Sequence, residues 1–380
     1  MASTSETKSP APTSPEPEAP TSEVAAPTSA SPPAAATASS PPVVATTAPA
    51  ATIEAETEAP EEEEFENPYS STDSAYSDSD LESYTTSLKS SVLNYQYENG
   101  RRYHAFRPGQ YFLPNDELEN HRLDLVHHTM TIAMQGQLHV APLDKPQKIM
   151  DIGTGTGVWA IEMADLYPTA HIVGNDLSPI QPKWVPPNLS FEVDDVESEW
   201  THTPSSFDFI YSRYMLGSIQ DWPRLFRQAF RALKPGGYIE ILEPDSTLRC
   251  ADDSLRDDSP LLKWNKLFVE AAETSGRSLV AAPKYQGWLE EAGFVDIKDN
   301  ISMLPNSPWP KERHLKELGG FHMAALTESL QGLSLRLFTH FHNMDVPEIE
   351  KLLVGVRKDI RNRRLPTYYD LHSIVARKPE

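Results

Sequence analysis

A turn with three alternating glycines is the feature that most limits how this chain can fold. The segment KIMDIGTGTG runs from Lys148 to Gly157, and its apolar strand ends at Asp151. Glycine lacks a Cβ, so this turn can adopt positive φ and bring backbone amides against a nucleotide-like ligand. Apolar spacing predicts a helix from Val158 to Leu166. Strand, glycine turn and helix together predict the start of a βαβ unit in a doubly wound α/β sheet.

Acidic residues follow the next two predicted strands. A strand over residues 170–174 runs into Asp176, which lies about twenty residues beyond the turn, where doubly wound folds present an acid to ribose hydroxyls. A strand in which Leu189, Phe191 and Val193 alternate ends in Asp195, and an acid there can accept the amine of an adenine. A glycine turn by itself also suits a site that binds nothing, but the two acids favour a nucleotide site.

The glycine spacing separates two nucleotide cofactors. A dinucleotide fingerprint is spaced GxGxxG and places a diphosphate on the helix N-terminus, whereas this turn is GxGxG with Asp151 just before it. A carboxylate repels a diphosphate but attracts the ammonium group of S-adenosylmethionine. The turn therefore favours the methyl donor, and an NAD-dependent oxidoreductase is the less favoured alternative.

Later segments continue the sheet in a recognisable order. FDFIYSR at residues 207–213 predicts a fourth strand, Asp221 is a predicted N-cap for a helix over residues 222–233, and LKPGGYIEILE leads into a fifth strand at Tyr238. With DIGTGTG, VGNDLS and VDDVE before them, these segments resemble the ordered motifs of the class I S-adenosylmethionine-dependent methyltransferases.

The resemblance implies a fold, and the segment before the glycine turn points to a more specific group within the family. It implies a Rossmann-like doubly wound sheet with extra helices, in which strands at 294–301 and 368–376 form an antiparallel C-terminal hairpin. Residues 97–128 are similar to the N-terminal signature of the LaeA-type fungal methyltransferases, a group associated with secondary metabolism and its regulation. The similarity spans about three quarters of the chain, from residue 92 to the end. One departure is Pro366, which stands where members of the group often carry a histidine.

Motif position assigns the donor site. Asp151 would orient the methionine ammonium, the glycines would admit the donor, Asp176 would bind the ribose hydroxyls, and Asp195 with the Val196 amide would read adenine. An acceptor hydroxyl or ammonium must lose a proton, and a histidine or carboxylate would serve. The implied donor-binding residues are Asp151, Gly153, Gly155, Gly157, Asp176, Asp195 and Val196, and the candidate catalytic residues are His104, His128 and Glu243.

Other kinds of chemistry find no support in the sequence. No CxxC is present, and His340 and His342 have no carboxylates clustered near them, so no metal site is predicted. No GxSxG is present, and the lone Cys250 has no histidine near it in sequence, which argues against covalent catalysis.

Composition divides the chain into a tail and a domain. Residues 1–90 contain 16 acidic and 2 basic side chains, so they carry −14 of the net charge of −22, and they contain no glycine. Such a Pro, Ser, Thr and Ala-rich segment buries too little apolar surface to offset its chain entropy, and we expect disorder. Residues 91–380 are predicted to form one methyltransferase domain, with an N-terminal helical cover (91–146), a cofactor-binding core (147–245), and acceptor-covering helices with the closing strands (246–380).

The expected partners follow from charge and family resemblance. An acidic chain is a poor ligand for nucleic acid, and no apolar run is long enough to span a membrane, so we expect a cytoplasmic or nuclear protein. The resemblance implies methylation of a small molecule in fungal secondary metabolism. The alternative is a nuclear regulator that acts through velvet-type partner proteins. Aromatic and other residues expected to line the acceptor pocket are Trp264, Phe268, Trp309, Phe321, His322 and Met323.

Overall fold

The computed structural model describes residues 94–107, 109 and 111–380. The acidic segment over residues 1–90, for which the sequence predicts disorder, lies outside the described residues.

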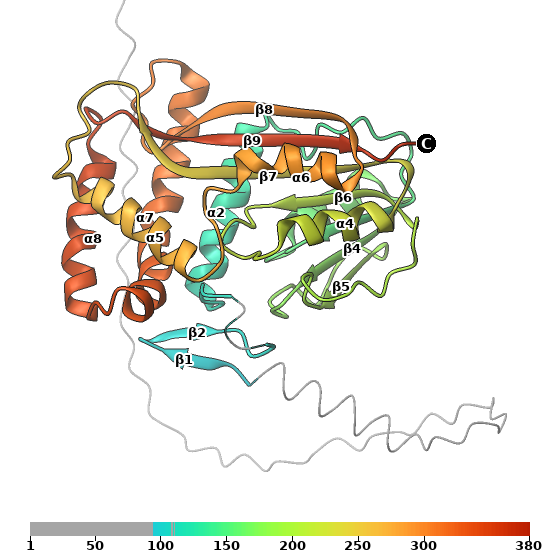
Figure 1. The fold of residues 1–380 in the computed structure, drawn as a ribbon, viewed down its shortest axis with the longest axis horizontal. Coiled ribbons are helices and arrows are strands. Elements are labelled where there is room, and N and C mark those ends of the chain that lie inside the picture. Colours follow the sequence, from blue (N-terminus) through green and yellow to red (C-terminus); the bar gives the residue numbers. More distant parts are fainter. Residues whose placement is uncertain (1–93, 108, 110) are drawn as a thin grey trace, which may run out of the picture. The chain divides into compact units, whose positions relative to one another are not determined.

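One twisted sheet organises the described part of the chain (Figure 1). Its seven strands have the order β5-β4-β3-β6-β7-β9-β8. All neighbours from β5 to β7 pair in parallel, whereas β9 is antiparallel to both β7 and β8. The strands are β3 (Lys148–Ile152), β4 (His171–Asp176), β5 (Leu189–Val193), β6 (Phe207–Arg213), β7 (Leu233–Cys250), β8 (Val295–Pro305) and β9 (Thr367–Arg377).

This order confirms the predicted α/β fold class. The strand sequence reverses direction beside β3, as a doubly wound sheet requires, and the C-terminal strands close the edge in antiparallel pairing. The connection between β8 and β9 is long, because it contains both α7 (Arg313–Phe341) and α8 (Val346–Arg361). The predicted hairpin is therefore a pair of adjacent strands with two helices between them in sequence.

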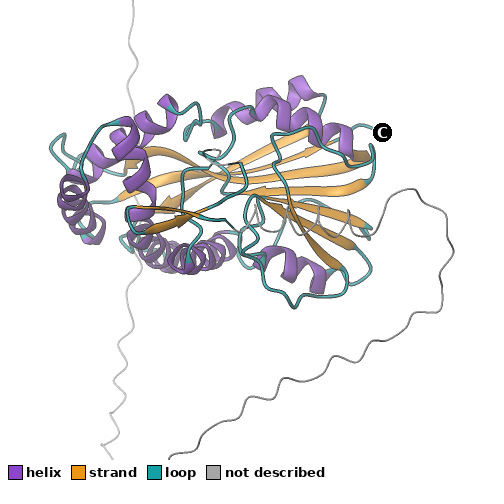
Figure 2. Ribbon diagram, turned by 90° about the horizontal axis from the view of Figure 1, so that it is seen from below, coloured by secondary structure: helices purple, strands orange, loops and turns teal. Residues whose placement is uncertain are grey.

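Helices cover both faces of the sheet (Figure 2). Side chains alternate along β3, so Ile149 packs in the cluster with α3, and Met150 packs in the cluster with α4 and α6. A third cluster joins the remaining helices beyond the strand ends. The helices are α2 (Glu117–Ala133), α3 (Val158–Leu166), α4 (Trp222–Ala232), α5 (Pro260–Thr274) and α6 (Tyr285–Ala292), with a 3₁₀ turn at Ala282–Lys284 and a hairpin of β1 (Gln96–Glu98) and β2 (Arg101–Tyr103).

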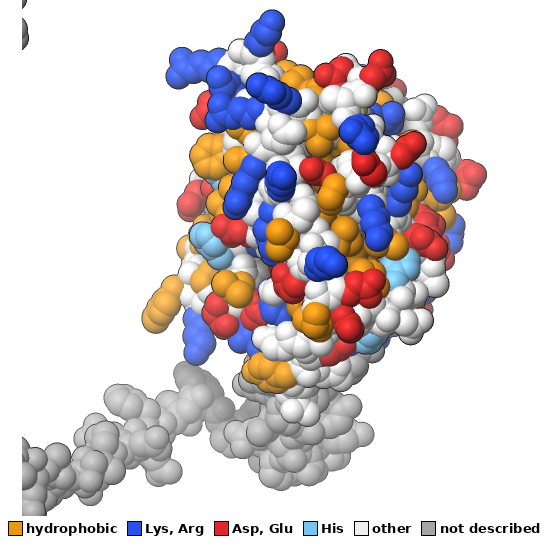
Figure 3. Space-filling view, turned by 90° about the vertical axis from the view of Figure 1, so that its left-hand side faces the viewer, with side chains coloured by type: hydrophobic (Ala, Val, Ile, Leu, Met, Phe, Trp, Pro, Cys, Tyr) orange, Lys and Arg blue, Asp and Glu red, His pale blue; other side chains and the backbone are white. Residues whose placement is uncertain are grey.

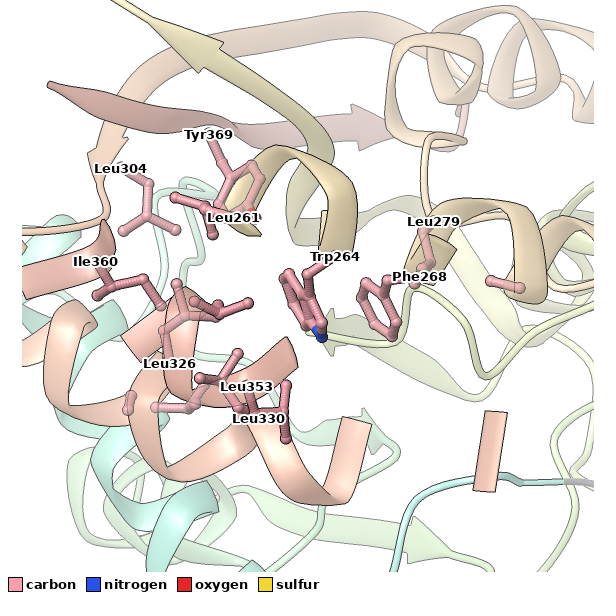
Figure 4. Close-up of a cluster of buried hydrophobic side chains, with 14 of the residues drawn as sticks. Leu261, Trp264, Phe268, Leu279, Leu304, Leu326, Leu330, Leu353, Ile360 and Tyr369 are labelled. Atoms are coloured by element: carbon pink, nitrogen blue, oxygen red, sulfur yellow. The ribbon is translucent and has the colours of Figure 1, made fainter. Parts of the chain in front are cut away.

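The third cluster forms the helical part of the domain (Figure 4). Trp264 and Phe268 of α5 stack with their ring centroids 5.1 Å apart and 13° between their planes. Leu326 and Leu330 of α7 lie in the same cluster, together with residues of α8. This cluster is thus built mainly from helices that lie between the last three strands in sequence.

Surface charge and helix composition bear on the partners that the sequence predicts. On the face drawn in Figure 3, Lys and Arg side chains are interspersed with Asp and Glu. Among residues 94–380, with 108 and 110 left aside, no helix is long and apolar enough to cross a membrane. In that same part of the chain, no group of three or more His, Cys, Asp or Glu side chains is placed to hold a metal ion.

Candidate active site

The glycine turn between β3 and α3 has the backbone that its sequence predicts. Gly153, Gly155 and Gly157 have φ values of 65°, 58° and 81°, which L side chains rarely adopt. A Cβ at Gly153 would lie 2.1 Å from Met215 Sδ, and a Cβ at Gly157 would lie 2.4 Å from Phe191 Cζ. The turn therefore needs glycine for packing at two positions. At Gly155 a Cβ would approach only Leu123, at 3.5 Å.

Two carboxylates stand at the ends of the adjacent strands β3 and β4. Asp151 is only 4% exposed and accepts a hydrogen bond from Thr154 Oγ1 over 2.6 Å. Asp176 accepts hydrogen bonds from the Gly155 and Ser178 amides, each over 2.9 Å. Burial raises the pKa of Asp151 to about 7 and the pKa of Asp176 to about 6. A cation or hydroxyl donors bound beside these two side chains would therefore favour their ionised form.

Asn175 is a member of this edge that the sequence analysis overlooked. It is the penultimate residue of β4, it is buried, and its Oδ1 accepts a hydrogen bond from the Gly153 amide over 3.2 Å. Its backbone carbonyl also accepts from the Thr154 amide, over 2.8 Å. Asn175 thus fixes the glycine turn against β4. In the sequence, this role is indicated by the position of Asn175 directly before the motif acid Asp176.

The third acid, Asp195, follows β5. Its Oδ1 accepts a hydrogen bond from the Glu197 amide over 2.9 Å, and Oδ2 forms an ion pair with Arg107. The carbonyl of Val196 accepts from Trp200 Nε1 and Gln228 Nε2. For the Val196 amide, the described residues provide no hydrogen-bond acceptor. That amide is available to a ligand nitrogen.

These features border one cleft at the carboxyl ends of β3 to β6. The sequence-predicted residues that line it are Asp151, Gly153, Gly155, Asp176, Asp195 and Val196. Gly157 does not line the cleft and instead is the N-cap of α3. From the N-terminal portion, Tyr111 and α2 contribute further walls. Such a crevice outside the strand ends is where doubly wound sheets bind nucleotides.

A second, mainly apolar cavity adjoins the cleft. The two share Tyr111, Leu123, Val126 and Tyr214 as wall residues. Tyr214 has a positive φ of 59°, a strained conformation for a residue with a bulky side chain. Three of the residues expected around an acceptor, Trp264, Phe268 and His322, line this cavity, whereas Trp309, Phe321 and Met323 do not.

The three candidate catalytic residues lie away from both spaces. The ring nitrogens of His104 are within 2.7 Å of the Phe106 carbonyl and 3.1 Å of the Tyr111 carbonyl. His128 is exposed and contacts the ring of Phe321 edge-on. Glu243 is fully buried and accepts from the Met215 and Leu216 amides over 2.6 and 3.1 Å, and burial raises its pKa to about 8. None of the three lines the cleft or the cavity.

A neighbour of these candidates does reach the cleft. His127 lines it, its Nδ1 accepts from Arg213 Nη2 over 3.0 Å, and its Nε2 lies 3.1 Å from Glu162. Burial, reinforced by the charge of Arg213, lowers the pKa of His127 to about 4. Both nitrogens of this ring are therefore engaged by protein groups.

Comparisons with known proteins identify the family of this chain. Residues 125–298 match the family model described as a methyltransferase domain. The chain is 43% identical to methyltransferase pytC of Aspergillus terreus over 79% of this chain and 93% of the relative. It is 40% identical to the secondary metabolism regulator LAE1 of Cochliobolus heterostrophus, over 74% of this chain and 94% of that one. It is 37% identical to the protein-methionine methyltransferase laeA of Emericella nidulans, over 74% of this chain and 76% of that one.

The fold is also similar to solved methyltransferase structures. Phosphoethanolamine N-methyltransferase 2 of Haemonchus contortus, in complex with S-adenosyl-L-methionine, matches with a TM-score of 0.46 and 15% identity, over 79% of this chain and 74% of that one. The sequence relatives are similar over most of their own length. This chain therefore belongs to the LaeA-like family of class I S-adenosylmethionine-dependent methyltransferases of fungal secondary metabolism.

Proposed function

We propose that this methyltransferase binds S-adenosylmethionine in the cleft and methylates a small molecule held in the adjoining apolar cavity. The observation that carries the proposal is the shared wall of Tyr111, Leu123, Val126 and Tyr214 between an acid-lined cleft and an apolar cavity. S-adenosylmethionine in the cleft and an acceptor in the cavity would meet beside these four residues, and neither would occupy the space of the other.

The residues of the cleft suit this donor. Asp151 would attract the methionine ammonium, Asp176 would accept from the ribose hydroxyls, and Asp195 with the Val196 amide would bind the adenine edge. When bound, S-adenosylmethionine supplies a methyl group that its sulfonium already makes electrophilic. The chain's task is then to align the acceptor and exclude water, which the buried helical walls of the cavity favour. A diphosphate would be repelled by Asp151, which disfavours a dinucleotide.

Titration calorimetry tests the donor assignment directly. We expect S-adenosylmethionine and its demethylated product to bind the purified full-length chain, and NAD to leave the calorimeter trace unchanged. The acceptor is tested with isotope-labelled donor and extracts of cells that lack the protein, followed by a mass-spectrometric search for a gain of one methylene unit. Binding of NAD in place of the methyl donor would contradict the proposal.

A second candidate function comes from the names of two relatives. LAE1 is called a regulator, and laeA of Emericella nidulans is called a protein-methionine methyltransferase. The regulator name, taken with the family resemblance of the sequence, makes a nuclear regulator acting through velvet-type proteins the alternative proposal for this chain. Recovery of such proteins in a pull-down, together with a nuclear fluorescent fusion, would favour it. Product formation from pathway intermediates by the purified chain, with a cytoplasmic fusion, would favour metabolite methylation.

A further inference from the structure

The charged and basic side chains that line the apolar cavity limit the chemistry of the acceptor. Among the described lining residues there is no Asp or Glu, whereas Arg122 and His322 are both present. Arg122 is buried, and its Nε and Nη2 donate to Glu119 Oε1 over 2.9 and 2.6 Å. A cationic amine would meet this guanidinium without a carboxylate to pair with. The lining therefore favours an uncharged acceptor.

His322 of α7 contributes to this lining a basic ring nitrogen that the described protein groups leave available. Its side chain is only 2% exposed, and its Nδ1 lies 2.9 Å from the Pro305 carbonyl. A carbonyl can only accept, so Nδ1 must carry the proton, and in the neutral ring Nε2 then holds a lone pair. The described part of the chain offers Nε2 no hydrogen-bond partner. Burial lowers the pKa of His322 to about 4, which keeps the ring neutral at physiological pH.

The other buried histidines near the site differ in this respect. Both ring nitrogens of His127 are engaged by Arg213 and Glu162, and both nitrogens of His104 lie against backbone carbonyls. His322 thus combines a fixed tautomer, an unpartnered basic nitrogen and a place in the wall of the acceptor cavity.

We infer that the acceptor is an apolar molecule bearing a hydroxyl group, and that His322 Nε2 accepts the proton of that hydroxyl. The inference rests on the proposed function of the cavity. The hydroxyl oxygen forms a bond to the methyl carbon as the carbon–sulfur bond breaks, and the hydroxyl proton passes to Nε2. One positive charge leaves the sulfur and one appears on the imidazole, so the net charge within the site does not change. Solvent then removes the proton from the imidazolium.

The variant His322→Asn separates this role from a packing role. The asparagine amide nitrogen occupies the place of Nδ1 and can still donate to Pro305, whereas nothing replaces Nε2. The matched control is Thr339→Ala, which changes the same helix outside both the cleft and the cavity and removes only hydrogen bonds from Thr339 Oγ1 to the Leu335 and Arg336 carbonyls within the helix.

The first measurement needs no methyl donor. Naphthol serves as the probe, and nitrogen NMR of the full-length chain with labelled histidine reports Nε2 of His322, whose signal is identified by its loss in His322→Asn. We expect naphthol to shift this signal, and to bind His322→Asn up to about tenfold more weakly, as for one lost hydrogen bond. Thr339→Ala should bind naphthol like the wild type. A His322 signal that saturating naphthol leaves unmoved would overturn the inference.

The second measurement is methyl transfer. We expect kcat with naphthol to fall by about 10²- to 10⁴-fold in His322→Asn, with the Kd for S-adenosylmethionine unchanged because His322 does not line the donor cleft. The deficit should narrow with para-nitrophenol above neutral pH, where this phenol is largely ionised and has little need of a base. Transfer at the wild-type rate by His322→Asn would overturn the inference. A wild-type chain that fails to bind the donor would instead overturn the proposed function, while the NMR result would still decide the role of His322.

Discussion

At the scale of single residues, Asp151 gives the donor cleft a dependence on pH. Its pKa of about 7 in the ligand-free protein means that it is largely protonated below pH 7, and a cationic donor binds the ionised form better. We expect the Kd for S-adenosylmethionine to rise by up to about tenfold for each unit that the pH falls below 7. Calorimetry between pH 5.5 and 7.5 checks this. An affinity that is flat over this interval would refute it.

The variant Asp151→Asn is the control for that titration. It should bind the donor more weakly, and the midpoint of the remaining pH dependence should move to about 6, the pKa of Asp176. The ligand-free variant should also be more stable than the wild type at pH 8. A carboxyl whose pKa is raised on folding loses stability as the pH rises from its unfolded value to its folded value, on the order of a few kcal/mol for this shift. Thermal unfolding at pH 8 and at pH 4, where the two proteins should converge, tests the sign.

Gly155 allows backbone strain to be separated from occlusion of the cleft. Its φ is 58°, and its Cβ position is open except for Leu123 at 3.5 Å, so Gly155→Leu should fold and place its side chain in the cleft. The matched control is Gly136→Leu, because Gly136 has a φ of 83° and nothing within 4 Å. We expect both to lose about 1–2 kcal/mol of unfolding free energy, and only Gly155→Leu to lose donor binding. Calorimetry showing wild-type affinity in Gly155→Leu would contradict the role of the turn.

At the scale of secondary structure, α2 carries part of both cavity walls and depends on its cap. Asp116 accepts from the Glu119 amide over 3.1 Å and from Arg101 Nε and Nη2 over 2.6 and 2.8 Å. Burial opposes ionisation of Asp116, but the contacts with Arg101 and the backbone outweigh it and lower the pKa. Asp116→Ala would remove the cap and leave Arg101 unpaired in a nearly buried position.

We expect Asp116→Ala to reduce the unfolding free energy by about 2–3 kcal/mol in urea titration. Asp221→Ala is the comparison, since Asp221 caps α4 through the Arg224 amide, over 2.9 Å, and stands exposed. It should cost about 1 kcal/mol. Equal losses in the two variants would show that the link from α2 to β2 adds nothing to the cap.

Local patterns predicted the elements around the donor cleft well. The sequence placed α3, β5 and β6 at their observed bounds, and apolar spacing over residues 285–292 predicts α6 there, because each element is short, periodic and bounded by turn residues. The sequence also predicts a helix over residues 311–330, whereas α7 continues to Phe341 through Gly332. A Cβ at Gly332 would lie 3.3 Å from Arg101 Nη1 and 3.4 Å from Pro114 Cγ, so tertiary packing, not a helix end, explains that glycine. Likewise β7 begins at Leu233 rather than Tyr238, with a register shift opposite β6.

At the scale of the whole molecule, the two spaces of the site differ in how far they can be predicted. The donor cleft is built from loops that each follow one strand, so consecutive motifs identify most of its lining. The acceptor cavity joins Tyr111 to residues as distant as Tyr369, and its lining depends on how helices far apart in sequence pack. That is why Trp264, Phe268 and His322 could be identified as candidates there but not separated from Trp309, Phe321 and Met323 by sequence alone.

The proposed domain boundary leads to a prediction about truncation. Glu98 of β1 contacts Arg336 over 3.2 Å and His340 over 2.8 Å, both in α7, so a chain that starts at residue 91 retains every described contact of the domain. We expect it to keep the thermal midpoint and the donor affinity of the full chain. A chain that starts at residue 117 would lose the α2 cap and Tyr111, which is a wall of both spaces, and would uncover the surface on which β2 packs. Calorimetry and thermal unfolding of the two truncated chains test this prediction. Loss of donor binding in the chain that starts at residue 91 would contradict it and would place part of the site within residues 1–90.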